Sequence, residues 1–290
     1  MKLKAAIEIT RPINDVIGCL TVIIGLLNTR RSIPTIDLIL NLILGAITYF
    51  LIASSGMIIN DIFDLEIDRI NRPTRPIPRG DITLKEAKIL FISTFALGII
   101  IAIINSIMLN LGFLNIIIAI FFGFIGWLYA AWGKKSGFLG NIIVSISFSI
   151  GLIYGAVLNG SSIPIYIYYF FLTSFFLLLA REIVKGCEDI EGDKKEGVRT
   201  LAILLNIRKA LYISIMFDIF AIIFFILPIF TDIINLFTFF ISMSFGLAIV
   251  IIATLFSLRS KLENHEFKKI SLLLKIGAFL GLVAFIFASI

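Results

Sequence analysis

Residues 87–109 read AKILFISTFALGIIIAIINSIML, and from Ile89 onward this stretch contains no charged side chain. An apolar run of about 20 residues is long enough to cross the hydrocarbon core of a bilayer as one α-helix. A helix that is hydrophobic on all sides needs an apolar surrounding on all sides. The stretch therefore predicts a membrane-spanning helix.

The same pattern recurs along the whole chain of 290 residues, of which 59% are hydrophobic and 15% are charged. Soluble domains carry about a quarter charged residues, so this composition argues against a soluble fold. We predict an all-α polytopic membrane protein that forms a single domain over residues 1–290. About nine transmembrane helices are expected, at 13–29, 36–59, 87–109, 111–132, 137–158, 163–184, 209–230, 233–257 and 270–289.

Basic residues are distributed unevenly between the two sides of these spans. All but two of the 25 Lys and Arg residues fall at the N-terminus or in loops on the same side, and the exceptions are Arg30 and Arg31. Cytoplasmic loops of membrane proteins are enriched in Lys and Arg. We therefore expect a multi-pass protein of the cell membrane with a cytoplasmic N-terminus and a short helical and loop cap over that face. The net charge of +6 reflects this topology and does not indicate a nucleic-acid partner.

An acidic cluster opens the loop after the second span, where Asp61, Asp64 and Asp68 are three and four residues apart. On a helix this spacing places the three carboxylates on one face. Carboxylates that crowd one face need a counter-charge, and Mg²⁺ prefers oxygen ligands supplemented by water and phosphate. No Cys or His lies nearby, so the cluster suits Mg²⁺ better than zinc.

A second acidic cluster follows the sixth span, where Asp189 and Asp193 are four residues apart. A helix that continued through the neighbouring glycines would also place Glu182 and Lys185 on the same face. A diphosphate bridged by magnesium needs ligands from both sides, so two clusters at one membrane face predict a single site. For either cluster alone, an exposed polar helix end is an open alternative.

Basic and polar side chains near these clusters could bind phosphate. Arg72 and Arg75 lie in a proline-rich loop that cannot continue a helix, and guanidinium groups bind phosphate with a planar fork. Lys134, after Tyr129 at the end of the fourth span, could complete the site, although both side chains also fit an interfacial anchor. Asn14 at the start of the first span could reach the site.

One further carboxylate, Asp218, lies inside the seventh span. An intramembrane carboxylate is a candidate functional group. It follows Arg208 and Lys209 by little more than two helical turns, so we expect an ion pair or a side chain that extends toward the membrane surface.

Two motifs resemble a known family. Asn60-Asp61-x-x-Asp64-x-x-x-Asp68, with Arg-Pro-x-x-Arg-Pro-Ile-Pro-x-Gly at 72–80, resembles the first signature of the UbiA superfamily of intramembrane aromatic and lipid prenyltransferases. Asp189-x-x-x-Asp193 resembles the second signature, and the resemblance covers essentially the whole chain. It implies catalysis by Asp61, Asp64, Asp68, Asp189 and Asp193. It implies Mg²⁺ ligands at the same five residues and Asn60. It implies diphosphate or phosphate binding by Asn14, Arg72, Arg75, Tyr129, Lys134, Arg181 and Lys185.

The stretch 181–193, with Thr200-Leu201, is most similar to archaeal members of the superfamily that build ether lipids. This resemblance implies transfer of a geranylgeranyl group from geranylgeranyl diphosphate to the hydroxyl of geranylgeranylglyceryl phosphate, by Mg²⁺-assisted ionisation. It implies lipid partners and no obligate protein partner. One alternative is an aromatic or tetrapyrrole acceptor, as in quinone, haem or chlorophyll-like pathways. A transporter of cations or phosphate is more remote, because transporter sites lie near the bilayer midplane.

Overall fold

The computed structural model describes all residues except 1, 32, 196 and 260, and it omits the side chains of Asn14, Asn71 and Lys195. Every regular element in the described ranges is helical, which confirms the all-α prediction. Eight of these helices are long and apolar enough to cross a membrane. A ninth span results if α1 (Leu3–Thr10) and α2 (Pro12–Asn28), which are bent by 53°, are counted together.

Contacts divide the chain into two compact units, and each is described by itself. The first unit comprises Met1–Trp132 and Ile150–Ile163, and the second comprises Gly133–Ser149 and Pro164–Ile290. Helix α7 (Phe138–Val157) contributes to both units. That the chain acts as one domain over residues 1–290 stays a prediction.

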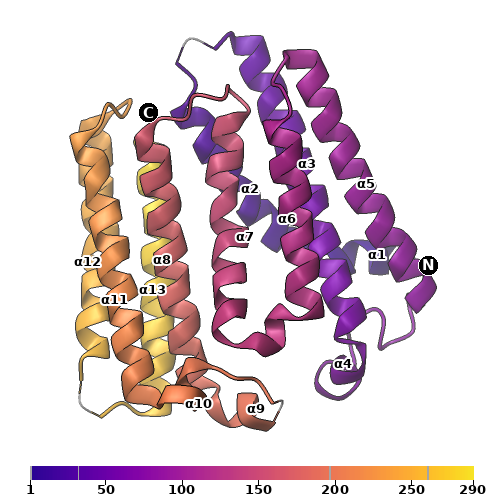
Figure 1. Cartoon of the computed structure of the whole chain (residues 1–290), viewed down its shortest axis with the longest axis vertical. Coiled ribbons are helices and arrows are strands. Elements are labelled where there is room, and N and C mark those ends of the chain that lie inside the picture. Colours follow the sequence, from indigo (N-terminus) through magenta and orange to yellow (C-terminus); the bar gives the residue numbers. More distant parts are fainter. Residues whose placement is uncertain (1, 32, 196, 260) are drawn as a thin grey trace. The chain divides into compact units, whose positions relative to one another are not determined.

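Helix α3 forms the centre of the first unit, where it packs against α2, α5 and α6 (Figure 1). Gly56 of α3 and Gly126 of α6 face each other so closely that a Cβ built on Gly126 would lie 3.5 Å from the Gly56 Cα. The absence of side chains here lets the two backbones approach. Besides α1, α2 and part of α7, this unit contains α3 (Thr35–Phe63), α4 (Leu65–Asn71), α5 (Leu84–Leu109) and α6 (Leu114–Ala131).

Helix α8 has the corresponding place in the second unit, where it packs against α11 and α13. The core there is aromatic, and the rings of Phe170 and Phe285 stack with their centroids 4.0 Å apart. The helices of this unit are η1 (Gly133–Ser136), α8 (Ile165–Glu188), α9 (Ile190–Lys195), α10 (Leu201–Leu205), α11 (Ile207–Ile226), η2 (Leu227–Phe230), α12 (Leu236–Ser257) and α13 (Asn264–Phe287).

Several helices extend past the apolar runs that predicted them. Helix α13 begins at Asn264, six residues before the predicted start, because Glu263 and Glu266 form a capping box there. Helix α5 begins at Leu84 for the same reason, with Thr83 and Glu86 as the box. Each box satisfies backbone N–H groups that a helix start leaves free, so charged residues can begin a helix before the apolar run.

The prediction for Asp218 is wrong. Its side chain is fully buried between α11 and α12, and the Thr254 hydroxyl lies 3.3 Å from its Oδ2. Arg208 points elsewhere, with Nε donating to the Tyr212 hydroxyl at 3.0 Å. The partner of Asp218 is therefore the Thr254 hydroxyl and not a Lys or Arg side chain.

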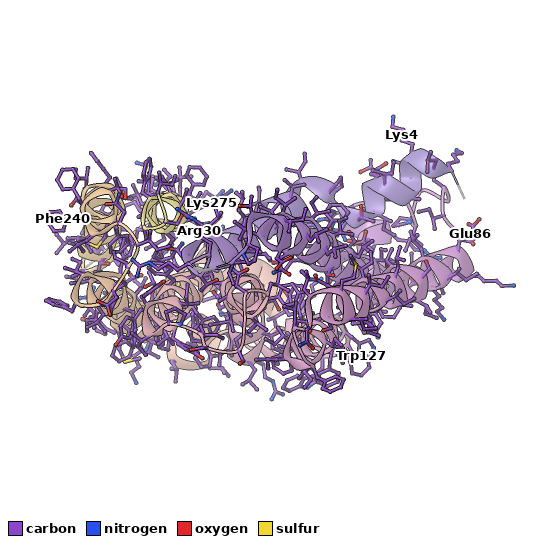
Figure 2. The ribbon with its side chains drawn as sticks, turned by 90° about the horizontal axis from the view of Figure 1, so that it is seen from above. Lys4, Arg30, Glu86, Trp127, Phe240 and Lys275 are labelled. Atoms are coloured by element: carbon purple, nitrogen blue, oxygen red, sulfur yellow. The ribbon has the colours of Figure 1, made fainter. Side chains whose placement is uncertain are left out.

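Large apolar side chains cover the outside of both units. Trp127 of α6 is 42% exposed and Phe240 of α12 is 52% exposed (Figure 2). Extended apolar surfaces of this kind are rare on soluble monomers. Together with the long apolar helices, they identify a multi-pass membrane protein.

Candidate active site

The first acidic cluster lies where α3 meets α4. Asp64 is the single residue between the two helices, with φ −83° and ψ 0°. The helical hydrogen bonds continue across it, because the Asp64 N–H donates to the Asn60 carbonyl at 2.9 Å and the Asp68 N–H to the Asp64 carbonyl at 2.8 Å. The spacing of the carboxylates is therefore helical throughout.

All three carboxylates of this cluster are buried, since Asp61, Asp64 and Asp68 are 2%, 6% and 4% exposed. The Arg75 guanidinium lies between two of them, at 3.1 Å from Asp61 Oδ1 and in direct contact with Asp68 Oδ2. Arg11 makes a second ion pair with Asp61. Arg75 therefore confirms that Asp61 and Asp68 share one face. A buried charge is tolerated only when it is paired and hydrogen-bonded.

The loop after α4 returns Arg75 to the cluster. The Arg75 N–H donates to the Arg72 carbonyl at 3.0 Å, and the Arg79 N–H donates to the Arg75 carbonyl at 3.0 Å, so the loop winds into consecutive turns. Arg72 lies on the exposed side of these turns. Of the two arginines in this loop that were predicted to bind phosphate, Arg75 contacts the carboxylates of the first cluster, whereas no such contact is found for Arg72 among the described residues.

Asn60 supplies an amide beside the cluster. Its Nδ2 donates to Asp64 Oδ2 at 3.1 Å, whereas its Oδ1 is buried and accepts no hydrogen bond from the described residues. A buried acceptor without a donor is costly, and a bound cation would satisfy it. Amide and carboxylate oxygens are the ligands that Mg²⁺ takes.

A complete metal cage is not found in the described part of the chain, where no three His, Cys, Asp or Glu side chains are arranged to hold an ion. Magnesium commonly uses only one or two protein carboxylates and fills its shell with water and substrate phosphate. The donor set at Asn60 and Asp64 fits that mode of binding.

Residues in and next to helix α1 make ion pairs with the first cluster and with the loop after α4, and the sequence did not indicate these contacts. Arg11 follows α1 with φ 51° and directs its guanidinium to Asp61, 50 residues away. Glu8 pairs with Arg79 at 2.9 Å, and Lys2 pairs with Asp81 at 2.5 Å. Hydrogen bonds from Lys2 and then Arg79 lower the pKa of the Asp81 carboxyl. In the sequence, Arg11 precedes a helix-starting proline, and the Arg11-Pro-x-Asn14 stretch also resembles the UbiA superfamily, but neither feature indicates a contact with Asp61.

The remaining predicted residues of the first unit lie near its helix ends. Asn14 is in the first turn of α2, but its side chain is outside the described residues. The adjacent Asp15 is buried and accepts a hydrogen bond from the Ser54 hydroxyl at 2.6 Å, so it packs against α3. Tyr129 lies in the last turn of α6 and is partly exposed.

The second acidic cluster has the same backbone but a different surrounding. Helix α8 continues through Gly186 and ends at Glu188, Asp189 is the junction residue, and α9 carries Asp193. The Asp193 N–H donates to the Asp189 carbonyl at 2.9 Å. The helix is thus interrupted for one residue, although not at a glycine. Asp189 is exposed and Asp193 is partly exposed.

Basic residues of the second unit are held next to this cluster. Glu182 accepts from Arg181 Nη1 at 2.7 Å and lies 3.5 Å from Lys185 Nζ, so it holds both predicted phosphate-binding cations on α8. Lys134 lies in η1 and is partly exposed. Carboxylates beside cations are what a metal–phosphate site requires, because the metal needs the first and the phosphate the second.

The sequence of this chain is similar to those of known proteins over nearly its whole length. Residues 19–285 match the UbiA prenyltransferase family. The digeranylgeranylglyceryl phosphate synthase of Korarchaeum cryptofilum is 32% identical, over 97% of this chain and 96% of its own. The enzyme of the same name from Saccharolobus solfataricus is 36% identical, over 100% of this chain and 98% of its own.

Solved structures agree with these relatives. One concerned with digeranylgeranylglyceryl phosphate synthase in membranes superposes with a TM-score of 0.84 at 32% identity, covering 99% of this chain and 98% of the other. A UbiA homologue from Archaeoglobus fulgidus bound to GPP and Mg²⁺ superposes with a TM-score of 0.70 at 17% identity, covering 97% and 99%, and shows a shared fold. The chain belongs to the UbiA prenyltransferase family.

Proposed function

We propose that this protein transfers a geranylgeranyl group from geranylgeranyl diphosphate to the hydroxyl of geranylgeranylglyceryl phosphate, and so forms digeranylgeranylglyceryl phosphate. The observation that carries the proposal is the first cluster, three buried carboxylates bracketed by Arg11 and Arg75. Relatives named for this reaction cover nearly the whole chain.

In this proposal the first cluster binds the diphosphate end of the prenyl donor. Asn60 and Asp64 are the metal ligands, because the Asn60 amide offers the unsatisfied oxygen and Asp64 lies beside it. Asp61 and Asp68 complete the acidic face. Arg75 is already placed among these carboxylates, so its guanidinium is available for phosphate oxygens at the same site.

Asp189 and Asp193 are proposed as the ligands of the second cluster, with Arg181 and Lys185 as its phosphate-binding cations. Their exposure suits groups that become ordered when a charged substrate arrives. That both clusters serve one diphosphate stays a prediction, as do roles for Asn14, Arg72, Tyr129 and Lys134.

Mg²⁺ is the proposed cofactor, and when bound it neutralises the charge that develops on the diphosphate leaving group. The bond between C1 of the prenyl chain and the diphosphate oxygen breaks, and the glycerol oxygen then bonds to C1 while its proton is released. Arg75 and Arg11 stabilise the departing phosphate charge. The apolar helices keep water from the allylic cation, which water would otherwise capture.

We also propose that both clusters face the cytoplasm. The support is the asymmetry of basic residues, because in the predicted topology nearly all Lys and Arg fall on the side that carries the clusters.

A transfer assay tests the proposed acceptor. The detergent-solubilised protein is incubated with radiolabelled geranylgeranyl diphosphate, Mg²⁺ and two competing acceptors, geranylgeranylglyceryl phosphate and 4-hydroxybenzoate. We expect label in the glycerol lipid alone, and none when a chelator is in excess. Label in the aromatic product would overturn the proposed acceptor, while the reaction would still be a prenyl transfer.

A further inference from the structure

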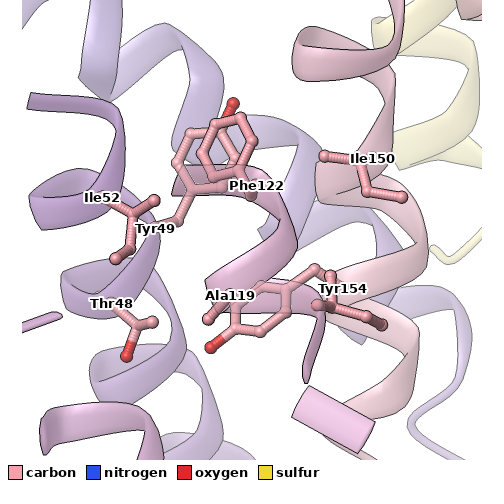
Figure 3. Close-up of a pocket in the computed structure, with 8 residues that line it drawn as sticks. Thr48, Tyr49, Ile52, Ala119, Phe122, Ile150 and Tyr154 are labelled. Carbon is pink, nitrogen blue, oxygen red and sulfur yellow. The ribbon is translucent and has the colours of Figure 1, made fainter. Parts of the chain in front are cut away.

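A groove lies at the end of the second unit where α9, α10 and the start of α11 meet (Figure 1). Its volume is about 680 Å³, within the range of sites that bind small molecules. By contrast, the cavity beside Tyr49 and Tyr154 in the first unit has a volume of about 10 Å³, which is room for about one water molecule (Figure 3). Of these two spaces, only the groove has room for part of a lipid.

The floor of this groove is apolar. Leu204 and Leu205 end α10 and are 59% and 39% exposed. The groove is also lined by Ala202, Ile203 and Ile207. Contact with a hydrocarbon chain would remove these side chains from water, which is favourable in proportion to the area covered.

Two cations border the apolar floor. Lys194 of α9 is exposed, and Arg208 lies in the first turn of α11. The Arg208 guanidinium is held in place, because its Nε donates to the Tyr212 hydroxyl at 3.0 Å and its Nη1 to the Arg259 carbonyl at 3.0 Å. None of the described residues that line the groove is acidic. The groove therefore suits a ligand with an anionic head and an apolar chain.

The turn between α10 and α11 has a strained backbone. Asn206 has φ 87° and ψ 160°, a conformation that residues other than glycine rarely adopt. Its Oδ1 accepts a hydrogen bond from the Lys209 N–H at 3.0 Å, and its carbonyl accepts one from the Ala210 N–H at 3.1 Å. The turn brings the end of α10 and the start of α11 to one groove, and strain of this kind is concentrated at functional sites.

The groove adjoins the second acidic cluster. Ile190 and Lys194 are four residues apart on α9, and both line the groove. Asp189 and Asp193 directly precede them in the sequence. Residues four apart share a helical face, and consecutive residues are about 100° apart around the axis, so the groove face of α9 lies beside its acidic face. An anion in the groove would lie next to the carboxylates proposed as metal ligands.

The acceptor of the proposed reaction has the chemistry that this groove requires. It carries a phosphate and a prenyl chain on one three-carbon glycerol unit. The reacting hydroxyl is therefore only a few bonds from the phosphate, so the phosphate must bind close to the diphosphate site and yet apart from it. An aromatic acceptor without a phosphate would not need these cations.

We propose that this groove binds the lipid phosphate acceptor, with Lys194 and Arg208 on its phosphate and Leu204 and Leu205 against its prenyl chain. The proposal rests on the proposed function and names the acceptor site of the same reaction. Because the donor diphosphate is bound by other residues, loss of either cation should raise KM for the acceptor and leave KM for geranylgeranyl diphosphate unchanged.

Equilibrium binding of two lipids to the protein in detergent, without Mg²⁺ or donor, tests the phosphate contact. The lipids are geranylgeranylglyceryl phosphate and geranylgeranylglycerol, which lacks the phosphate. The wild type should bind the phosphorylated lipid about 10- to 100-fold more tightly, the effect expected of hydrogen bonds to a charged group. Lys194→Ala and Arg208→Ala should each lose much of this ratio. Leu204→Ser should weaken binding of both lipids and keep the ratio.

Lys209→Ala is the matched control, because Lys209 is next to Arg208 and exposed but does not line the groove. Its ratio should equal that of the wild type. If Arg208→Ala does not fold, the exposed Lys194 decides.

Equal binding of the two lipids by the wild type, or an unchanged ratio in Lys194→Ala, would overturn the proposal while the transfer reaction stands. Competition by phosphatidylglycerol as strong as that by geranylgeranylglyceryl phosphate would also overturn it, since the groove would then be a general site for anionic lipids. Failure of the wild type to transfer a prenyl group to geranylgeranylglyceryl phosphate would instead refute the proposed function.

Discussion

The two acidic clusters share a backbone and differ in what surrounds it. In each, one aspartate joins two helices in nearly the same conformation, with φ −83° and ψ 0° at Asp64 and φ −94° and ψ 13° at Asp189. In each, a second aspartate follows four residues later, and its N–H bonds to the junction carbonyl. Yet Asp64 is 6% exposed and therefore buried, whereas Asp189 is an exposed residue.

The difference lies in the counter-charges. Arg11 reaches the first cluster from 50 residues away and Arg75 from the loop that follows it, and together they offset part of its negative charge. At the second cluster, the basic residues Arg181 and Lys185 pair with Glu182 on the same helix. The ion pairs of the first cluster therefore join separate segments of the chain, whereas Arg181 and Lys185 at the second pair with a neighbour on their own helix. We therefore expect substitutions in the first cluster to lower both activity and stability, and substitutions in the second cluster to lower activity alone.

The largest effect should come from removing a carboxylate in either cluster. Asp64→Ala and Asp193→Ala should each lower prenyl transfer by at least about 100-fold, the loss seen when one group that stabilises developing charge is deleted. Rates measured with labelled geranylgeranyl diphosphate check this. Normal turnover by either variant would show that its cluster is not part of the active site, and that the two clusters do not share a function.

A smaller effect should distinguish two arginines of one loop. Arg75→Ala leaves Asp68 without its buried counter-charge, which should cost about 3 kcal/mol of unfolding free energy. Mg²⁺ alone should restore part of the lost stability, because a cation can replace the guanidinium. Arg72→Ala is the control, since Arg72 is exposed and its variant should unfold like the wild type.

Thermal unfolding in detergent, with and without Mg²⁺, measures both variants. Equal stability of the two, or no response of Arg75→Ala to the metal, would show that the first cluster is not the buried metal site described above.

The smallest effect should appear at the edge of the first cluster, where Asp81 holds Lys2 and Arg79. Its pKa is lowered in the folded state, so its contribution to stability is present above the unfolded value of about 3.9 and is lost as the pH falls through the folded value. Asp81→Asn should unfold slightly earlier than the wild type near pH 6. The two unfolding curves should converge in acid, and a constant difference would exclude this ion pair as the cause.

Much of the fold could be predicted from sequence, because apolar runs and basic loops report directly on the bilayer. The helices corresponding to all nine predicted runs are present, and the i, i+3, i+7 spacing placed Asp61, Asp64 and Asp68 on one face. Helix ends were less predictable, since capping by Glu263 or Thr83 moves a boundary into polar sequence.

The partners of the site residues could not be predicted, because spacing along the chain does not determine which basic side chain turns toward the carboxylates. Nothing local indicates that Arg11 reaches Asp61, or that Arg75 rather than Arg72 turns inward. Asp218 shows the same limit, since sequence suggests a nearby cation and packing supplies the Thr254 hydroxyl.

The most direct test of the central claim is a paired measurement on Asp61→Asn and Asp189→Asn, with transfer rate and unfolding temperature taken from the same preparations. Both variants should lose transfer, and only Asp61→Asn should also lose stability, because it removes the buried carboxylate that pairs with Arg11 and one of the two that Arg75 contacts. Equal unfolding temperatures for the two variants, or full transfer by Asp189→Asn, would contradict the account.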